Sequence, residues 1–209
     1  MGRSSEYDVT ALCRGGRRIG LLGGSFNPAH GGHLHVSREA LKRLRLHEVW
    51  WLVSPQNPLK PEAGMAPLED RLAAARALAQ GRRIRVTAIE ARLGTRYTVD
   101  TVAALRQRCP GARFVLLIGA DILSELPRWR RWLDLFASLP IAVFDRRPYS
   151  LRALSGLAAR RFARFRVTER AAAALAGQDP PAWAFLHGRA HPASATAIRE
   201  SRKAKPGRK

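Results

Sequence analysis

Short apolar runs alternate along this chain with segments in which apolar residues recur every three to four positions. The runs have the length of buried strands, and the segments between them have the spacing of amphipathic helices. This alternation predicts βαβ crossovers, and therefore an α/β fold whose parallel sheet is covered by helices on both faces. The expected strands are 19–22, 49–53, 84–89, 114–118 and 141–144, and the expected helices are 33–46, 68–79, 98–108 and 129–137.

The later part of the chain is less regular, although residues 151–163 and 169–176 have helical spacing and 183–186 has the composition of a short strand. Residues 54–67 hold four prolines and one glycine, so we expect a non-helical loop within the domain. The expected organisation is a basic N-terminal extension, a single domain and a basic C-terminal tail. Their bounds are residues 1–17, 18–201 and 202–209.

The net charge of +21 has two explanations. It could serve nucleic-acid binding, or it could attract small polyanions such as ATP and pyrophosphate. The arginines are spread through every expected helix and loop, and no basic stripe interleaved with aromatic residues is present. This spread favours the second explanation, with no specific nucleic-acid partner.

The cysteines and the apolar runs indicate in which cellular compartment we expect the protein. The chain has two cysteines, Cys13 and Cys109, without C-x-x-C spacing, which indicates reduced thiols and neither a disulfide framework nor a zinc knuckle. No apolar run approaches the length of a membrane span, and the N-terminal residues do not resemble a signal peptide. The sequence therefore predicts a cytoplasmic protein without a membrane partner.

The eleven residues 23–33, GGSFNPAHGGH, carry the most specific chemical signal. They follow an expected strand and lead into an expected helix, the context in which a glycine-rich turn binds phosphate. Two histidines, His30 and His33, stand where the helix begins, so backbone N–H groups and imidazoles would face the same anion. The alternative is a tight turn that happens to carry surface histidines.

Two further segments carry polar groups at the ends of expected elements. Ser194 and Thr196 are residue types that cap helices, and Arg199 follows one turn later, so together they could hold triphosphate oxygens. The alternative there is a simply capped terminal helix. Gly119 and Asp121 end the fourth expected strand, where Asp121 could accept from ribose hydroxyls or cap a helix over 122–126.

Residues 23–33 resemble the G-G-[ST]-F-[DN]-P-x-H-x-G-H signature of the nucleotidylyltransferase superfamily. Residues 194–199 resemble its I-S-[SA]-T-x-I-R motif. The resemblance implies a Rossmann-like doubly wound sheet and transfer of a nucleoside monophosphate with release of pyrophosphate. It implies catalytic roles for His30, His33 and Arg199. The ATP-binding residues it implies are Gly23, Gly24, Ser25, Phe26, His30, His33, Gly119, Asp121, Ser194, Thr196 and Arg199.

Other motifs resemble the nicotinate-mononucleotide adenylyltransferase subfamily. They are I-G-x-D at 118–121, P-x-W at 127–129, the [ST]-Y-T-like 96–98 and the R-R-P at 146–148. The resemblance assigns Tyr97, Thr98, Trp129 and Arg147 to nicotinate mononucleotide. After the second strand many members read P-N-x-x-P-P-H-K; this chain lacks the histidine, so only Asn57 and Lys60 match.

The reaction implied is adenylyl transfer from ATP to nicotinate mononucleotide, with Mg²⁺ carried by ATP because no carboxylate cluster suggests a metal site of the protein's own. A different phosphate acceptor, such as pantetheine phosphate, and a basic nucleic-acid-binding protein are the alternatives. A metal site of His30, His33 and His35 is disfavoured because no fourth ligand stands at suitable spacing. The sequence leaves open whether the protein forms a homo-oligomer.

Overall fold

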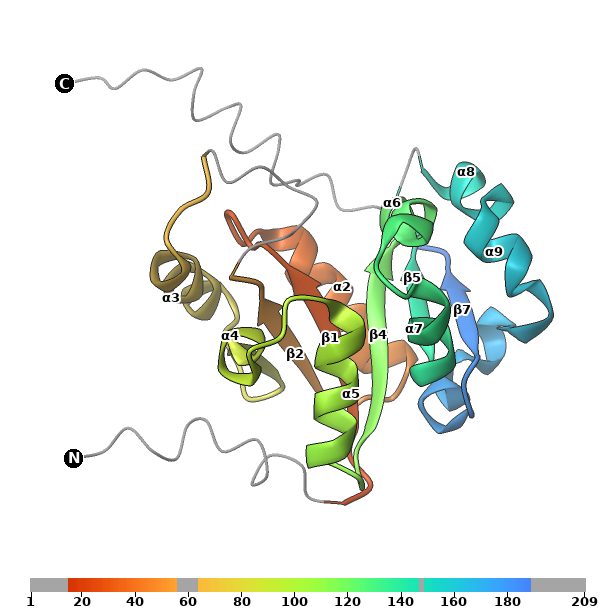
Figure 1. The fold of residues 1–209 in the computed structure, drawn as a ribbon, viewed down its shortest axis with the longest axis horizontal. Coiled ribbons are helices and arrows are strands. Elements are labelled where there is room, and N and C mark those ends of the chain that lie inside the picture. Colours follow the sequence, from red (N-terminus) through yellow and green to blue (C-terminus); the bar gives the residue numbers. More distant parts are fainter. Residues whose placement is uncertain (1–14, 56–63, 147–148, 189–209) are drawn as a thin grey trace.

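The computed structural model describes residues 15–55, 64–146 and 149–188. Within them, seven strands pair in parallel into one sheet with the order β3-β2-β1-β4-β5-β7-β6 (Figure 1). The predicted α/β fold with a doubly wound parallel sheet is confirmed. The strands are β1 (Arg18–Gly24), β2 (Glu48–Val53), β3 (Ile84–Thr87), β4 (Arg113–Gly119), β5 (Ile141–Phe144), β6 (Arg166–Val167) and β7 (Trp183–Leu186).

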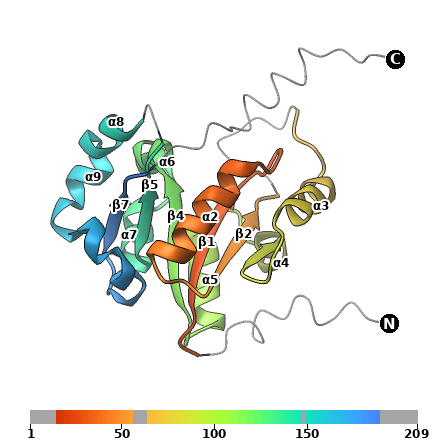
Figure 2. The same cartoon turned by 180° about the vertical axis from the view of Figure 1, so that it is seen from behind.

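Each strand turns alternate side chains to the two faces of the sheet, and each face carries its own apolar core. Ile19 and Leu21 of β1 pack in one core, and Leu22 packs in the other. Figures 1 and 2 show α5 and α2 on opposite sides of the sheet. The first core is covered by α4 (Ile89–Leu93), α5 (Thr98–Arg108), α6 (Ala120–Glu125), α7 (Trp132–Ser138), α8 (Ser150–Ser155) and α9 (Leu157–Arg161); the second by α2 (Gly31–Arg43), α3 (Leu68–Leu78) and the 3₁₀ segment η3 (Glu169–Gly177).

The strand order places the crossover point of the fold between β1 and β4. Leu22 of β1 pairs with Trp51 of β2 on one side and with Leu117 of β4 on the other. Strands β2 and β3 follow each other on one side of β1, and β4 then pairs with the other side of β1. In such sheets the carboxyl ends of the two central strands diverge and leave room for a ligand. The segments with unusual polar residues follow these strands.

Several predicted bounds were wrong by a turn, and local backbone geometry explains the differences. The helix expected over 129–137 begins only at Trp132, because Trp129 is extended (ψ 144°) and Arg131 has the left-handed φ of 52°. The helix expected over 151–163 is interrupted at Gly156, whose extended ψ of 165° separates α8 from α9. Strand β3 ends at Thr87, and Ile89 opens α4 instead of closing the strand. Strand β6 was not predicted.

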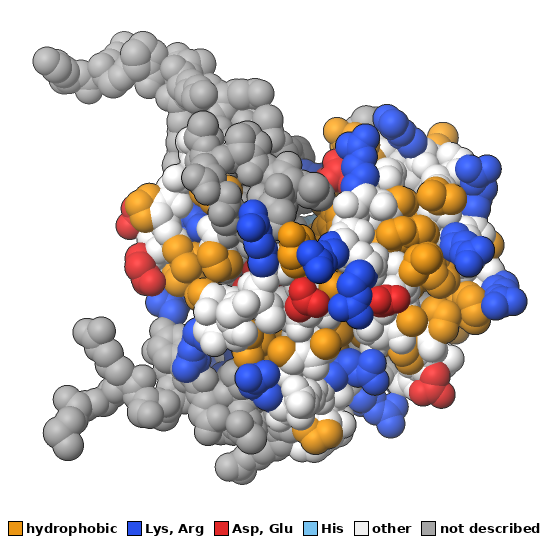
Figure 3. Space-filling view, viewed as in Figure 1, with side chains coloured by type: hydrophobic (Ala, Val, Ile, Leu, Met, Phe, Trp, Pro, Cys, Tyr) orange, Lys and Arg blue, Asp and Glu red, His pale blue; other side chains and the backbone are white. Residues whose placement is uncertain are grey.

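The expectation of reduced thiols was wrong at Cys109, which is buried and disulfide-bonded. Cys13 lies outside the described residues. In the described part of the chain, no helix combines the length and the hydropathy that a membrane span requires. Lys and Arg side chains are scattered over the face shown in Figure 3.

Candidate functional site

The glycine-rich turn leaves the carboxyl end of β1 at the crossover point of the sheet. Gly23 and Gly24 close the strand, and Phe26 follows with a left-handed φ of 48° while its ring is buried. The chain therefore turns sharply inward between Ser25 and Asn27 before α2 begins. A β carbon at Gly24 would be in van der Waals contact with the Phe26 ring at 3.4 Å, so the ring packs directly against the strand end. The turn presents backbone to any ligand above the strand ends.

His30 and His33 form a reciprocal cap at the start of α2. Nδ1 of His30 accepts from the N–H of Gly32 at 3.1 Å, and Nδ1 of His33 accepts from the N–H of His30 at 3.1 Å. Because both Nδ1 atoms are acceptors, the neutral form of each ring carries its proton on Nε2. Each imidazole is thereby an Nε2–H donor, and the ring centroids lie 3.9 Å apart. The structure thus places both histidines together at the start of α2, and their role as donors to phosphate oxygens stays a prediction.

The aromatic rings of Phe26 and Trp51 pack against the histidine pair. The ring of Phe26 lies 4.5 Å from that of His33 and stacks on Trp51 of β2 at 5.1 Å. Trp51 Nε1 donates to the Ser37 hydroxyl at 2.8 Å, and that hydroxyl donates to the carbonyl of His33 at 2.8 Å. The first turn of α2 is thus fixed to β2 by stacking and hydrogen bonds together. The sequence analysis assigned no role to Trp51 or Ser37. The feature that could have indicated Trp51 is its place as a large aromatic residue in an apolar strand.

The end of β4 holds a carboxylate close to the backbone. Oδ2 of Asp121 accepts from Arg146 at 2.6 Å, and Oδ1 is buried with no hydrogen-bond partner among the described residues. A β carbon at Gly119 would stand 2.4 Å from Oδ1, so only glycine lets the carboxylate fold back over the strand end. An acceptor in this position suits a ligand hydroxyl. The arginine that holds Asp121 is Arg146, which the sequence analysis did not assign.

The start of α5 and the segment before α7 lie against each other. Tyr97 precedes α5 without a side-chain cap, and Thr98 is its first residue. The guanidinium of Arg130 lies over the Tyr97 ring at 4.8 Å, and Arg131 reaches Asp100 at 3.5 Å. Tyr97 and Trp129 are half-buried against the same core.

These contacts place three of the predicted nicotinate residues, Tyr97, Thr98 and Trp129, on two segments of the chain that lie against each other. Trp132, in contrast, makes edge-on contacts with Phe136 and Phe162 at 6.2 and 5.9 Å. Its half-buried ring packs against the first core. The remaining predicted site residues lie outside the described residues: Asn57, Lys60, Arg147, Ser194, Thr196 and Arg199.

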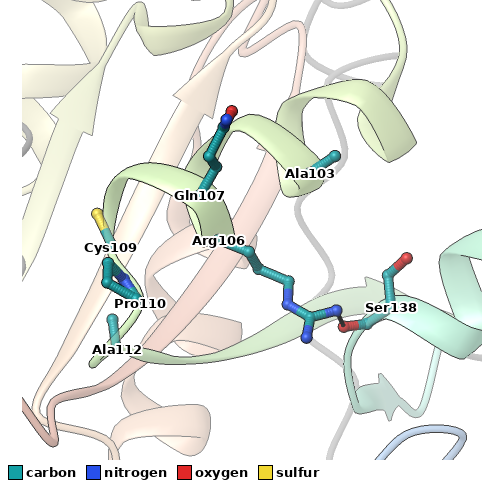
Figure 4. A pocket seen from close by; sticks show the side chains of 7 residues that line it. All are labelled: Ala103, Arg106, Gln107, Cys109, Pro110, Ala112 and Ser138. Atoms are coloured by element: carbon teal, nitrogen blue, oxygen red, sulfur yellow. Dashed lines mark hydrogen bonds between the residues drawn. The ribbon is translucent and has the colours of Figure 1, made fainter.

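A hollow of 540 Å³ lies at the other end of α5, near the amino-terminal edge of the sheet (Figure 4). Arg106, one of its lining residues, donates to the carbonyl of Ser138 at 2.7 Å. The hollow shares no residue with the region above the strand ends, so it is not the candidate site. Across residues 15–55, 64–146 and 149–188, no group of three or more His, Cys, Asp or Glu could hold a metal ion.

A buried carboxyl lies next to the end of β2. Glu90 of α4 is 7% exposed, and its burial raises the pKa of the carboxyl, an effect that a hydrogen bond with Ser54 partly offsets. Arg71 of α3 is buried beside the same strand end. Sequence analysis assigned neither residue, and the signal available for Arg71 was its place among Leu72 and Ala75 on the apolar side of α3.

We expect the Glu90 carboxyl to make stability depend on pH. Because its folded-state pKa is above the unfolded value, the stability it contributes is present at low pH and is lost as pH rises through the folded pKa. Glu90→Gln should therefore gain stability relative to the parent protein as pH increases from 4 to 8, by on the order of 1 kcal/mol. Urea denaturation across this range measures the difference. Glu125→Gln, at an exposed position, is the control and should follow the parent curve.

Comparison with known proteins identifies relatives over most of the chain. The profile of the family described as "Cytidylyltransferase-like" matches residues 21–201. A protein of Methylorubrum extorquens named "Probable nicotinate-nucleotide adenylyltransferase" is 54% identical over 182 residues, covering 87% of this chain and 98% of the relative. A protein of the same name from Parvibaculum lavamentivorans is 55% identical over 185 residues, covering 88% and 92%.

Solved structures include a similar fold. The nicotinic acid mononucleotide adenylyltransferase of Plasmodium falciparum, in complex with APC, aligns with a TM-score of 0.64 at 14% identity. The alignment covers 88% of this chain and 83% of the other. At this identity the likeness concerns the arrangement of strands and helices.

Proposed function

Because this chain belongs to the nicotinate-nucleotide adenylyltransferase family, within the cytidylyltransferase-like group, we propose that it transfers AMP from ATP to nicotinate mononucleotide. The products are nicotinate adenine dinucleotide and pyrophosphate. The observation that carries the proposal is the pair of imidazole donors, His30 and His33, at the crossover point of the sheet, in a chain more than half identical to proteins of that name. The catalytic domain is residues 18–201, with the basic segments 1–17 and 202–209 outside it.

The reaction needs alignment more than it needs a base. A 5′-phosphate oxygen of the mononucleotide attacks the α-phosphorus of ATP, and the bond from that phosphorus to the bridging oxygen breaks. The attacking phosphate is already anionic at neutral pH, so no side chain has to remove a proton from it. The protein accelerates the transfer by holding the two phosphates in line and by stabilising charge on the oxygens around the α-phosphorus.

Each part of the site has a role in this reaction. Backbone N–H groups of residues 23–26 bind the ATP phosphates beside the positive end of the α2 dipole, and Nε2–H of His30 and His33 donate to oxygens that gain charge in the transition state. Asp121 accepts from the ribose of ATP. By resemblance, Ser194, Thr196 and Arg199 hold the departing pyrophosphate. Mg²⁺ fits as an ion carried by ATP, where it neutralises phosphate charge, because the described residues offer it no cluster of ligands.

The acceptor is recognised at the start of α5. The first backbone N–H groups of a helix have no partner within the helix, so those at Thr98 can donate to the carboxylate of a nicotinate ring. Trp129 offers an aromatic face to the ring, and Tyr97 lines the same region. Asn57, Lys60 and Arg147 are proposed for the rest of the mononucleotide by resemblance alone. A location in the cytoplasm stays a prediction from the sequence.

The test is pyrophosphate release from ATP with each acceptor in turn. We expect release with nicotinate mononucleotide and none with pantetheine phosphate. Release with pantetheine phosphate alone would assign the chain to another acceptor. A polynucleotide-binding protein would instead show affinity for DNA or RNA that falls steeply with salt and survives His30→Ala.

A further inference from the structure

Arg71 of α3 is a buried cation whose described partners are all backbone carbonyls. Its side chain is 3% exposed. Nη1 donates to the carbonyls of Ser25 and Ser54, both at 2.7 Å, and Nη2 donates to that of Pro55 at 2.9 Å. Nε donates to the carbonyl of Ala66 at 2.9 Å. One guanidinium therefore connects four carbonyls.

These carbonyls belong to three separate stretches of chain. Ser25 lies in the glycine-rich turn after β1, Ser54 and Pro55 follow β2, and Ala66 precedes α3. Two further hydrogen bonds connect the same stretches. The N–H of Ser54 donates to the carbonyl of Gly24 at 2.9 Å, and the Asn27 side chain donates to the carbonyl of Gly64 at 3.0 Å. Arg71 makes four of the hydrogen bonds in this network.

Burying a cation among carbonyls carries a cost, and desolvation lowers the pKa of Arg71. A guanidinium can recover that cost because its five N–H groups form a flat fork that serves several acceptors at once. A lysine ammonium keeps the charge but has three donors on one atom and cannot span the same positions. The site requires the shape of arginine as well as its charge.

The position of Ser25 bears directly on the histidines. The next residue, Phe26, has the left-handed φ of 48°, and its ring supports His33 at 4.5 Å. Fixing the carbonyl of Ser25 fixes the peptide that sets the direction of Phe26. A shift of this peptide would carry the Phe26 ring, and with it the imidazole of His33, away from the ends of β1 and β4.

We propose that Arg71 is a positioning residue for nucleotidyl transfer: it holds the glycine-rich turn against the end of β2 and so sets where the imidazoles of His30 and His33 stand. The proposal rests on the proposed function, and Arg71 acts through the backbone without touching a substrate. Its loss should misplace the donors that act in the transition state more than it weakens ground-state binding of ATP. The effect should fall mainly on kcat.

Arg71→Lys is the main test, and Arg83→Lys is its matched control. Arg83 also donates to backbone carbonyls, those of Leu46 and His47, but at the amino-terminal edge of the sheet. We expect Arg71→Lys to lower kcat at least about tenfold, with the KM for ATP changed less than about threefold, because misalignment of reacting groups costs rate before it costs affinity. Arg83→Lys should leave both constants close to the parent values.

A spectroscopic readout separates positioning from general loss of stability. Imidazole ¹⁵N resonances of His30 and His33, recorded without substrates and below the melting temperature of each variant, should move in Arg71→Lys and stay in place in Arg83→Lys. In Arg71→Ala, added guanidinium at non-denaturing concentration should restore part of the lost kcat.

The outcomes are distinct. Parent-like kcat in Arg71→Lys, equal losses in the two lysine variants, or unmoved imidazole resonances would each overturn the positioning role. If Arg71→Ala does not fold, the lysine variant alone decides. A parent protein that is inactive with nicotinate mononucleotide would overturn the proposed function instead, and the imidazole spectra would still report on Arg71.

Discussion

Removing the Nε2 donors of His30 or His33 is expected to lower kcat by roughly two to three orders of magnitude, the usual cost of losing one preorganised donor to a transition state. Alanine is not the sharpest replacement, because each Nδ1 also caps the start of α2. Losing such a cap costs about 1 kcal/mol of stability. His30→Asn and His33→Asn place an amide oxygen where Nδ1 accepts from the same N–H groups, and their shorter side chains cannot carry an N–H donor to the position of the imidazole Nε2.

Steady-state kinetics and thermal denaturation of these two variants measure the two effects separately. We expect melting temperatures near that of the parent protein together with the loss of turnover. His35→Ala, in the same helix but outside the reciprocal cap, is the control and should keep most of the activity. Turnover near the parent level in both His30→Asn and His33→Asn would remove the histidines from the mechanism.

Trp129→Ala is expected to lower kcat/KM for nicotinate mononucleotide by about tenfold to a hundredfold, because stacking a base or ring on an aromatic face contributes about 1–3 kcal/mol. Trp129→Phe should retain most of the efficiency, since it keeps an aromatic face. Leu133→Ala, at an exposed position in the following helix, is the matched control and should have little effect. Initial rates of pyrophosphate release at low acceptor concentration give the comparison.

The same assay tests the preference between the two pyridine mononucleotides. Nicotinamide brings a donor and no charge toward the N–H groups at Thr98, and hydrogen bonds left unmade cost about 1–3 kcal/mol. We therefore expect at least about tenfold higher kcat/KM with nicotinate mononucleotide. Trp129→Ala should damage the use of both. Equal efficiency of the parent protein with both mononucleotides would contradict the carboxylate pocket at α5.

Much of the fold could be predicted because its signals are local. Strands β5 and β7 and helix α5 have the predicted bounds, since continuous apolar runs and period-3.6 patterns are set by neighbouring residues along the chain. The glycine-rich turn and the histidines at the start of a helix were likewise readable as one continuous stretch. The bounds that were wrong, at Trp129 and Gly156, are places where the backbone leaves helical geometry inside an apolar pattern.

The sequence by itself therefore determined the element types, the apolar faces and the chemical character of each polar segment. The tertiary structure decided which of these segments meet. The strand order sets the ends of β1 and β4 side by side, and it buries Arg71 and Glu90 near the end of β2. The local pattern places Arg71 on the apolar side of α3 but does not show what it contacts there, and it does not distinguish Glu90 from a surface charge. Their partners are carbonyls or hydroxyls from other parts of the chain, and such contacts exist only once the sheet has assembled.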